Sequence, residues 1–352
     1  MTDHPIEADA LALHTLGQPA AEHGGNLDWA REHFGTPAEG WLDLSTGISP
    51  WSYPAAPEST DAWHGLPSPA ALEHRAAQNF GAPALAVPGS QLALNLLPAL
   101  RARSRVAIPK PEYAEHARAW QRWGHDVTRV SPQALADSPP EALDWDVVVL
   151  SHPNNPTGGS TTTAHLLSWR KRLAERGGWL VVDEAFTDAH PERSLATSVT
   201  DGPGLIVLRS LGKFFGLAGA RIGFVLAHGR EREALRELLG PWPVAGPSLA
   251  RAESALQDTA WCARHRDRLA AAGRRLAHRL DAAGLTSPSG THLFRWVPSQ
   301  QSRAWQHALA EQGIWVRAFD DPPGLRFGLP GTPDEEERLG RALARARKRI
   351  SD

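Results

Sequence analysis

Short apolar runs rich in β-branched residues alternate with longer stretches in which apolar positions recur at helical spacing. The short runs predict strands at 105–108, 127–130, 146–150, 179–183, 205–209 and 221–226. The longer stretches between them predict helices at 91–101, 115–123 and 163–176. This alternation is typical of an α/β fold in which helices flank a mostly parallel sheet.

The pattern changes after about Gly229. A long helical stretch at 248–283 precedes strand-like runs at 292–297, 314–318 and 325–328, and a helix at 334–350 closes the chain. We therefore expect a smaller α+β domain at 236–352 beside a large domain at 49–235. The segment 1–48 lacks a sheet pattern, and we expect it to join the small domain and the active site. Proline-rich 49–69 is expected to be a connector.

Composition narrows the class of protein. With 352 residues, 41% of them hydrophobic and 22% charged, the chain can bury a sizeable core. The net charge of −2 argues against nucleic acid or a membrane surface as partners. The single Cys262 excludes an intramolecular disulfide and suits a reducing compartment. No apolar run has the length of a membrane span, and the acidic start does not resemble a secretory signal, so we expect a cytoplasmic protein.

One lysine lies in an unusual setting. Lys213 follows the strand run 205–209 and is surrounded by Phe, Leu, Ala and Gly, although the chain has only four lysines. An apolar setting lowers the pKa of a lysine and makes it a nucleophile that can form a Schiff base. Ser210 and Arg221 flank it, and these residue types bind phosphate. The stretch therefore predicts a phosphate-bearing aldehyde, pyridoxal phosphate (PLP), bound to Lys213.

Two further motifs follow short apolar runs. Gly89-Ser90-Gln91 opens a helix, where backbone N–H groups attract phosphate, but Gly-Ser at this position is more often only a helix cap. Tyr113 follows strand 105–108 and could stack on an aromatic ligand. Taken alone, it is more often a partly buried aromatic at a rim.

Polar residues also end two central strands. His152-Pro-Asn-Asn155-Pro-Thr-Gly158 forms a turn in any interpretation, and Asn155 could donate a hydrogen bond to a ligand oxygen. Asp183 ends strand 179–183, where it could pair with a protonated pyridine nitrogen. The alternatives are an ordinary strand-terminal carboxylate or a metal ligand. We expect no metal, because no ligand cluster with suitable spacing accompanies Asp183.

The order of these motifs resembles that of PLP-dependent enzymes of the aspartate-aminotransferase fold, fold type I. The resemblance implies that Lys213 carries the cofactor, Asp183 binds the pyridine nitrogen, Asn155 binds the ring hydroxyl and Tyr113 stacks on the ring. Lys213, Asp183 and Tyr113 are then the catalytic residues. The resemblance also implies that four residues hold the cofactor phosphate: Gly89, Ser90, Ser210 and Arg221. Gln91 would be a further cofactor-binding residue.

Within this fold, the chain is similar to the threonine-phosphate decarboxylases of cobalamin biosynthesis. The similarity lies in His23-Gly24-Gly25-Asn26, in 42–50 and in Gly-Ile-Trp-Val-Arg317 ahead of Arg326. It implies decarboxylation of L-threonine O-3-phosphate to (R)-1-amino-2-propanol O-2-phosphate by a homodimer. The substrate residues would then be His23, Gly24, Gly25, Asn155, Arg317 and Arg326.

Two other functions stay open at this stage. A histidinol-phosphate aminotransferase shares most cofactor motifs, and a non-catalytic PLP-binding relative would share them too. Three positions depart from the pattern of relatives. Phe186 replaces a frequent tyrosine, Leu66 stands where relatives often place a tyrosine that reaches the partner's cofactor phosphate, and Gly47 replaces an asparagine of some decarboxylases.

Overall fold

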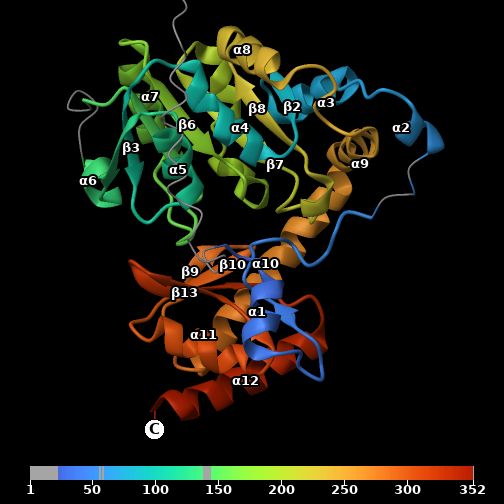
Figure 1. The fold of residues 1–352 in the computed structure, drawn as a ribbon, viewed down its shortest axis with the longest axis vertical. Helices are drawn as coiled ribbons and strands as arrows, with labels where there is room; N and C mark the ends of the chain where they lie inside the picture. Colours follow the sequence, from blue (N-terminus) through green and yellow to red (C-terminus); the bar gives the residue numbers. More distant parts are fainter. Residues whose placement is uncertain (1–22, 55–56, 58, 138–143, 352) are drawn as a thin grey trace, which may run out of the picture.

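The computed structural model describes residues 23–54, 57, 59–137 and 144–351. Its centre is a seven-stranded sheet in the order β2-β8-β7-β6-β5-β3-β4 (Figure 1). β8 runs antiparallel to both of its neighbours, and the other pairs are parallel. The strands are β2 Ala84–Val87, β3 Arg105–Pro109, β4 Asp126–Val130, β5 Val147–Ser151, β6 Trp179–Asp183, β7 Leu205–Ser210 and β8 Gly223–Ala227.

Helices cover both faces of this sheet. Leu72, Leu166 and Leu249 bring α3, α7 and α9 into the core on one face, and Leu94, Trp120 and Leu235 bring α4, α5 and α8 onto the other. Central strands β5 and β6 are buried along their whole length, as expected for a sheet covered on both sides. The helices are α2 Thr60–His64, α3 Ala70–Phe80, α4 Ser90–Leu96, α5 Ala114–Arg122, α6 Pro132–Asp137, α7 Thr163–Ala174, α8 Gly229–Leu239 and α9 Gly246–Gln257.

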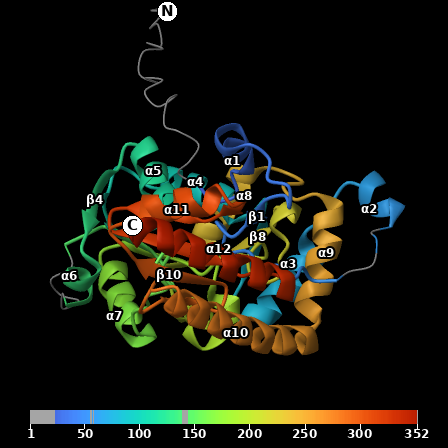
Figure 2. The same cartoon turned by 90° about the horizontal axis from the view of Figure 1, so that it is seen from below.

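A smaller sheet lies below the first one in Figure 1. Its strands are antiparallel in the order β12-β13-β10-β9, and β1 pairs separately and in parallel with β11. Figure 2 shows α10 and α12 across the underside of this part. The elements are α1 Leu27–Phe34, β1 Leu42–Asp43, α10 Thr259–Ala282, β9 Ser289–Thr291, β10 Phe294–Pro298, α11 Ser302–Ala310, β11 Ile314–Trp315, β12 Arg317–Asp320, β13 Pro323–Gly328 and α12 Pro333–Ser351.

The fold class expected from the sequence is confirmed, with a mostly parallel main sheet between helices and a smaller sheet beside it. Several predicted boundaries are wrong. The stretch 248–283 is two helices, because the chain breaks at Asp258, whose side chain caps the second one. The run 314–318 is divided between β11 and β12. Arg221 has left-handed backbone angles and precedes β8, and the connector 49–69 contains the short helix α2.

The topology places the predicted motifs at one edge of the sheet. β3, β5, β6 and β7 are parallel, so the residues that follow them share the carboxyl edge, where ligands bind in such sheets. β8 is antiparallel, and its first residue Gly223 therefore lies at the same edge, opposite Ser210. This brings Arg221 beside the end of β7 as well.

Candidate active site

The predicted residues surround one cavity of about 280 Å³ between the carboxyl edge of the main sheet and the smaller sheet. Every residue that the sequence assigned to cofactor or substrate lines it, with the exception of Gly25. The backbone N–H of Gly25 already donates to Ser45 Oγ at 2.7 Å, so Gly25 shapes the loop from behind. Gly24 does line the cavity, and a Cβ there would lie 2.4 Å from the carbonyl oxygen of Ser45.

Lys213 lies in the loop between β7 and β8. Among the described residues its Nζ has no hydrogen-bond partner, and it lies 5.7 Å from the centre of the Phe186 ring. Burial, together with the nearby charge of Arg326, lowers the pKa of Lys213 to about 8, while the carboxylate of Asp183 acts in the opposite direction. A lysine with this pKa is partly neutral near pH 8 and is therefore a competent nucleophile.

Asp183 is the last residue of β6 and is buried. Its Oδ1 accepts a hydrogen bond from the Ala185 N–H at 3.0 Å, and its Oδ2 lies 3.4 Å from Nε2 of His116. His116 is a buried residue of α5, three positions after Tyr113, and the sequence analysis did not identify it. The sequence offered no signal for His116, because its place on α5 is explained by packing and its contact with Asp183 forms only in the folded chain.

The side chain of Tyr113 is hydrogen-bonded to a residue in the first turn of α4. Tyr113 Oη donates to Gln91 Oε1 at 2.8 Å, so Gln91 orients the ring by direct contact. Burial raises the pKa of Tyr113 to about 12, and the nearby carboxylates of Glu115 and Asp183 add to this effect. The phenol is therefore neutral over the range in which the protein would work.

A buried carboxylate braces the loops that carry Tyr113 and Asn155. Glu112 accepts hydrogen bonds from the backbone N–H of Tyr113 and of Ser151, both at 2.8 Å, and from Asn154 Nδ2 at 3.2 Å. Burial raises the pKa of Glu112. Glu112 could not be found from the sequence either, because a single acid in a proline-rich turn carries no recognisable pattern.

The residues predicted to bind the cofactor phosphate line the same cavity as Lys213. Gly89 precedes the first turn of α4 with φ of 76°, and a Cβ at this position would lie 2.9 Å from Nη2 of Arg221. Only glycine therefore lets the guanidinium approach the helix N-terminus this closely. Ser90 and Ser210 line the same end of the cavity. Backbone N–H groups, hydroxyls and a guanidinium together form a cradle for an anion.

Two more guanidinium groups enter from the smaller sheet. Arg326 on β13 is buried, and its Nη1 donates to Asn155 Oδ1 at 2.5 Å while its Nη2 donates to the Ser45 carbonyl at 2.7 Å. Arg317 on β12 pairs with Arg326 in the strand register and is half-buried. Burial is the main cause that lowers the pKa of Arg326 to about 9, and the nearby charge of Arg317 contributes. Burial likewise lowers the pKa of Arg317 to about 10.

His23 lies at the rim of the cavity. Its Nε2 is 3.2 Å from Glu115 Oε1 and 3.4 Å from Arg118 Nη1, and its ring meets the edge of Tyr113. The side chain of His23 is 45% exposed. The rim therefore carries a histidine that an acidic neighbour holds in place.

The three departures from relatives have structural counterparts. A Cβ at Gly47 would lie 2.7 Å from the ring of Phe186, which itself packs edge-on against Phe294. Phe186 therefore occupies the space that a side chain at position 47 would need. Leu66 is 72% exposed and lies outside the cavity of its own chain.

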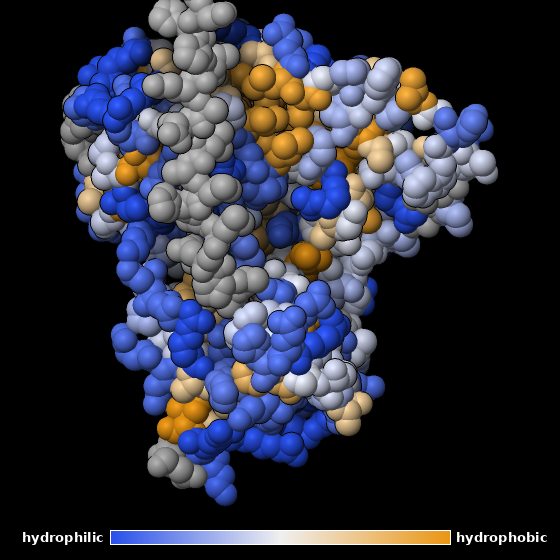
Figure 3. Space-filling model, viewed as in Figure 1, coloured by the Kyte–Doolittle hydropathy of each residue, from blue (hydrophilic) through white to orange (hydrophobic). Residues whose placement is uncertain are grey.

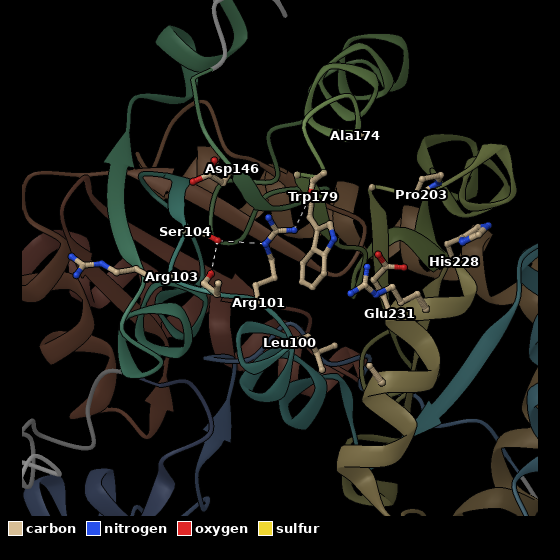
Figure 4. A pocket seen from close by; sticks show the side chains of 16 residues that line it. Leu100, Arg101, Arg103, Ser104, Asp146, Ala174, Trp179, Pro203, His228 and Glu231 are labelled. Carbon is tan, nitrogen blue, oxygen red and sulfur yellow. Dashed lines mark hydrogen bonds between the residues drawn. The ribbon is translucent and has the colours of Figure 1, made fainter. Parts of the chain in front are cut away.

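A larger cavity, of about 680 Å³, lies at the opposite edge of the main sheet (Figure 4). Its most distinctive feature is the guanidinium of Arg101, which lies 4.5 Å above the Trp179 ring and donates to the Gly177 carbonyl at 2.8 Å. None of the predicted site residues lines it. The cavity that the predicted residues line is therefore not the larger of these two.

Two kinds of feature are absent from the described part of the chain. No group of three or more His, Cys, Asp or Glu residues there could hold a metal ion. No helix there is long and apolar enough to span a bilayer.

Comparisons with known proteins identify the family of the chain. The model of the family "Aminotransferase class I and II" matches residues 58–343. A threonine-phosphate decarboxylase of Pseudomonas aeruginosa is 46% identical over 92% of this chain and 97% of its own, and one of a Sinorhizobium species is 41% identical over the same shares. The crystal structure of histidinol-phosphate aminotransferase from Sinorhizobium meliloti with pyridoxal-5'-phosphate superimposes with a TM-score of 0.78 at 21% identity, covering 92% of this chain and 95% of the other. The chain therefore belongs to the class I and II aminotransferase family.

Proposed function

We propose that the protein is a PLP-dependent decarboxylase that converts L-threonine O-3-phosphate to (R)-1-amino-2-propanol O-2-phosphate and carbon dioxide, a step of cobalamin biosynthesis. One observation carries the proposal. Arg317 and Arg326 line the same cavity as Lys213, so a substrate with two anionic groups finds two separate cations beside the reactive amine. The two threonine-phosphate decarboxylases above, which match along nearly their whole lengths, support the same substrate.

The donor set fits pyridoxal phosphate. Lys213 would bind its aldehyde carbon, Asp183 its pyridine nitrogen and Asn155 its ring hydroxyl, while Tyr113 would stack on the ring. The phosphate would lie in the cradle formed by Gly89, Ser90, Ser210 and Arg221, with Gln91 keeping Tyr113 in position. When bound, PLP supplies an electron sink for the substrate Cα bond that lies perpendicular to its ring.

Asn155 and Arg326 would act as a pair. Asn155 Oδ1 is already engaged by Arg326, which leaves its Nδ2 as the donor for a ligand oxygen. Arg326 is anchored by that contact and by the Ser45 carbonyl, so its position barely depends on the substrate. We assign to Arg326 the substrate carboxylate, because a fixed guanidinium sets the angle at which a carboxylate is held.

The phosphate of the substrate would lie between Arg317 and the loop His23-Gly24-Gly25. Gly24 has no side chain that could cover this part of the cavity, and Arg317 faces it from β12. A substrate held at both ends cannot rotate freely. Reaction choice follows from that orientation, because decarboxylation requires the Cα–carboxylate bond to be perpendicular to the ring and transamination requires the C–H bond there.

The experiment that tests the function separates three outcomes. The purified protein with PLP is given L-threonine O-3-phosphate and, separately, histidinol phosphate with 2-oxoglutarate. We expect carbon dioxide from the first and little keto-acid exchange in the second. Preferred transamination of histidinol phosphate would instead establish an aminotransferase. Bound PLP without turnover of either substrate would establish a non-catalytic relative.

A homodimer is part of the proposal. The large apolar side chains of Trp63, Leu66, Leu238 and Trp242 are each about half exposed or more, which is costly on a monomer surface. Figure 3 shows hydrophobic side chains gathered over α4 and α8. A second copy that covers this surface would bring Leu66 to the partner's site as an apolar contact. Light scattering should give twice the monomer mass, and a fully active monomer would contradict this.

A cytoplasmic location completes the proposal. The free, buried Cys262 is the chain's only cysteine, which suits a reducing compartment. Fractionation of cells that express the protein at its natural level tests this directly.

A further inference from the structure

Two charged residues lie immediately beside the proposed cofactor residues in the sequence, and their side chains point to the opposite face of the sheet. Glu184 follows Asp183 at the end of β6, and Arg209 precedes Ser210 at the end of β7. Side chains alternate between the faces of a strand, so Asp183 and Ser210 face the cavity while Glu184 and Arg209 face the α3 and α7 side.

On that side the two residues form a closed ionic cluster. Arg209 Nη1 donates to Glu184 Oε2 at 2.7 Å, and Nη2 donates to Asp188. Glu184 also accepts from Ser194 Oγ and from the backbone N–H of Leu195, both at 2.6 Å. Glu184, Arg209 and Asp188 are 0%, 3% and 5% exposed. The Phe80 ring covers the guanidinium at 4.6 Å.

We propose that this Glu184–Arg209–Asp188 cluster is a positioning group that fixes the separation between Asp183 and Ser210, and with it the affinity for PLP. The inference rests on the proposed function, in which Asp183 holds the pyridine end of the cofactor and Ser210 the phosphate end. A backbone hydrogen bond from Glu184 N to the Leu208 carbonyl (2.9 Å) joins the ends of β6 and β7. The ion pair between Glu184 and Arg209 is a second link between the same two strand ends.

The chemistry of the cluster favours a positioning role over a stabilising one. A buried ion pair is often no more stable than apolar side chains of similar volume, because both charges lose their hydration. A guanidinium is planar and rigid, so one that donates from Nη1 to one carboxylate and from Nη2 to another nevertheless fixes how the two carboxylates lie. Two carboxylates share one guanidinium here, and Asp188 Oδ2 has no hydrogen-bond partner in the described chain. Glu184→Gln leaves a balanced Arg209–Asp188 pair, but its amide NH2 must face either Arg209 or the Leu195 N–H, both of which donate. Ser194→Ala removes only one donor and is the milder variant.

The test measures the dissociation constant of PLP for cofactor-free protein by equilibrium dialysis, alongside the melting temperature. We expect Glu184→Gln to raise that constant roughly tenfold to a hundredfold, as the loss of outer-shell partners does in metal sites. Ser194→Ala, which removes one hydroxyl donor to Glu184, should raise it less. Glu336→Gln is the matched control, because Glu336 pairs with Arg275 on α10 far from the cavity. It should lower the melting temperature and leave the PLP constant unchanged.

The outcomes separate the inference from the function on which it rests. An unchanged PLP constant in folded Glu184→Gln, or in Ser194→Ala if the first variant does not fold, overturns the positioning role. If Glu184→Gln only lowers the melting temperature, by as much as Glu336→Gln does, the positioning role is also overturned. The cluster would then be an ion pair that serves stability alone. Failure of the wild-type protein to bind PLP would refute the proposed function instead.

Discussion

The buried amine of Lys213 should weaken the fold when the cofactor is absent. Its pKa is about 8 in the folded protein against 10.5 for an exposed lysine, so the unfolded chain holds the proton more tightly. The cost is fully present below pH 8 and disappears as the pH rises from 8 through 10.5. Lys213→Met should therefore stabilise the cofactor-free protein at pH 7 by on the order of 2–3 kcal/mol.

Thermal unfolding of both cofactor-free proteins between pH 7 and 10 checks this prediction. The advantage of the variant should shrink with rising pH. An equal difference at every pH would mean that packing, and not the charge, separates the two proteins. In the same variant, borohydride should no longer attach PLP to the chain.

Arg317→Ala tests the proposed phosphate contact. A hydrogen bond to a charged group contributes about 1.5–3 kcal/mol, so kcat/KM for L-threonine O-3-phosphate should fall roughly tenfold to a hundredfold. PLP should stay bound, because Arg317 is not part of the proposed cofactor set. A loosened substrate should also give more abortive transamination. Arg303→Ala is a control, since Arg303 lies near the same strand and pairs with Asp320 at the surface. Wild-type efficiency in Arg317→Ala would contradict the assignment.

For single residues, the sequence predicted those that belong to contiguous motifs. It missed residues whose role depends on a contact with a distant part of the chain. Lys213, Asp183 and Asn155 could be found because each ends a strand run or lies in an unusual local setting. His116 lies in an amphipathic helix whose pattern is fully explained by packing. Its contact with Asp183 appears only when α5 is placed against β6.

Strands were predicted better than helix boundaries because β-branched runs define them directly. Strand 179–183 matches β6 at both ends, and the other predicted strands of the main sheet overlap observed ones. The helical run 248–283 hid a break, since Asp258 interrupts two amphipathic patterns without glycine or proline to mark the boundary. α3 was not predicted, because it follows the proline-rich connector at Pro69 without a capping side chain that would mark where the helix begins.

The cap at Asp258 leads to a prediction about the stability of helix α10. Asp258 Oδ1 accepts the backbone N–H of Trp261 at 2.8 Å and caps the 24-residue helix α10. Asp258→Ala should cost about 1 kcal/mol of the free energy of unfolding, and Asp258→Asn should keep most of it. Urea titration measures both. Turnover should be unchanged, because the cap lies outside the candidate site. Equal stability of the alanine and asparagine variants would show that the cap is not what matters there.

The whole site exists only because two sheets pack together. Asn155 and Arg326 are 171 positions apart in the chain, and no spacing rule predicts that their side chains meet. The alternation of strands and helices predicted the layered fold. That residues of the small domain would line the same site as those of the large domain was expected only from the resemblance to known enzymes. The domain boundaries at 49 and 236 stay predictions, since nothing in the molecule tests where each part would fold alone.

The junction of the two parts contains a pair of histidines. His190 follows β6 and its small 3-10 turn, and His292 lies in the turn between β9 and β10. Their ring centres are 4.1 Å apart, and the His292 N–H lies 3.3 Å from His190 Nε2. Burial is the main cause that lowers the pKa of His190 to about 3, and His292, Arg193 and Arg295 act in the same direction. Burial also lowers the pKa of His292. His190 therefore stays neutral in the folded protein near neutral pH.

Acid should weaken this junction. The unfolded chain binds a proton at His190 below about pH 6.5 and the folded protein does not, so stability is lost as the pH falls from 6.5 toward 3. At pH 5 the loss from His190 alone should be about 2 kcal/mol. His190→Asn should flatten the dependence of the melting temperature on pH between 7 and 5, although it loses the contact between the rings. His64→Asn, at an exposed position on α2, should leave that dependence as it is in the wild type. An equally steep loss in His190→Asn would assign the acid sensitivity to groups elsewhere in the molecule.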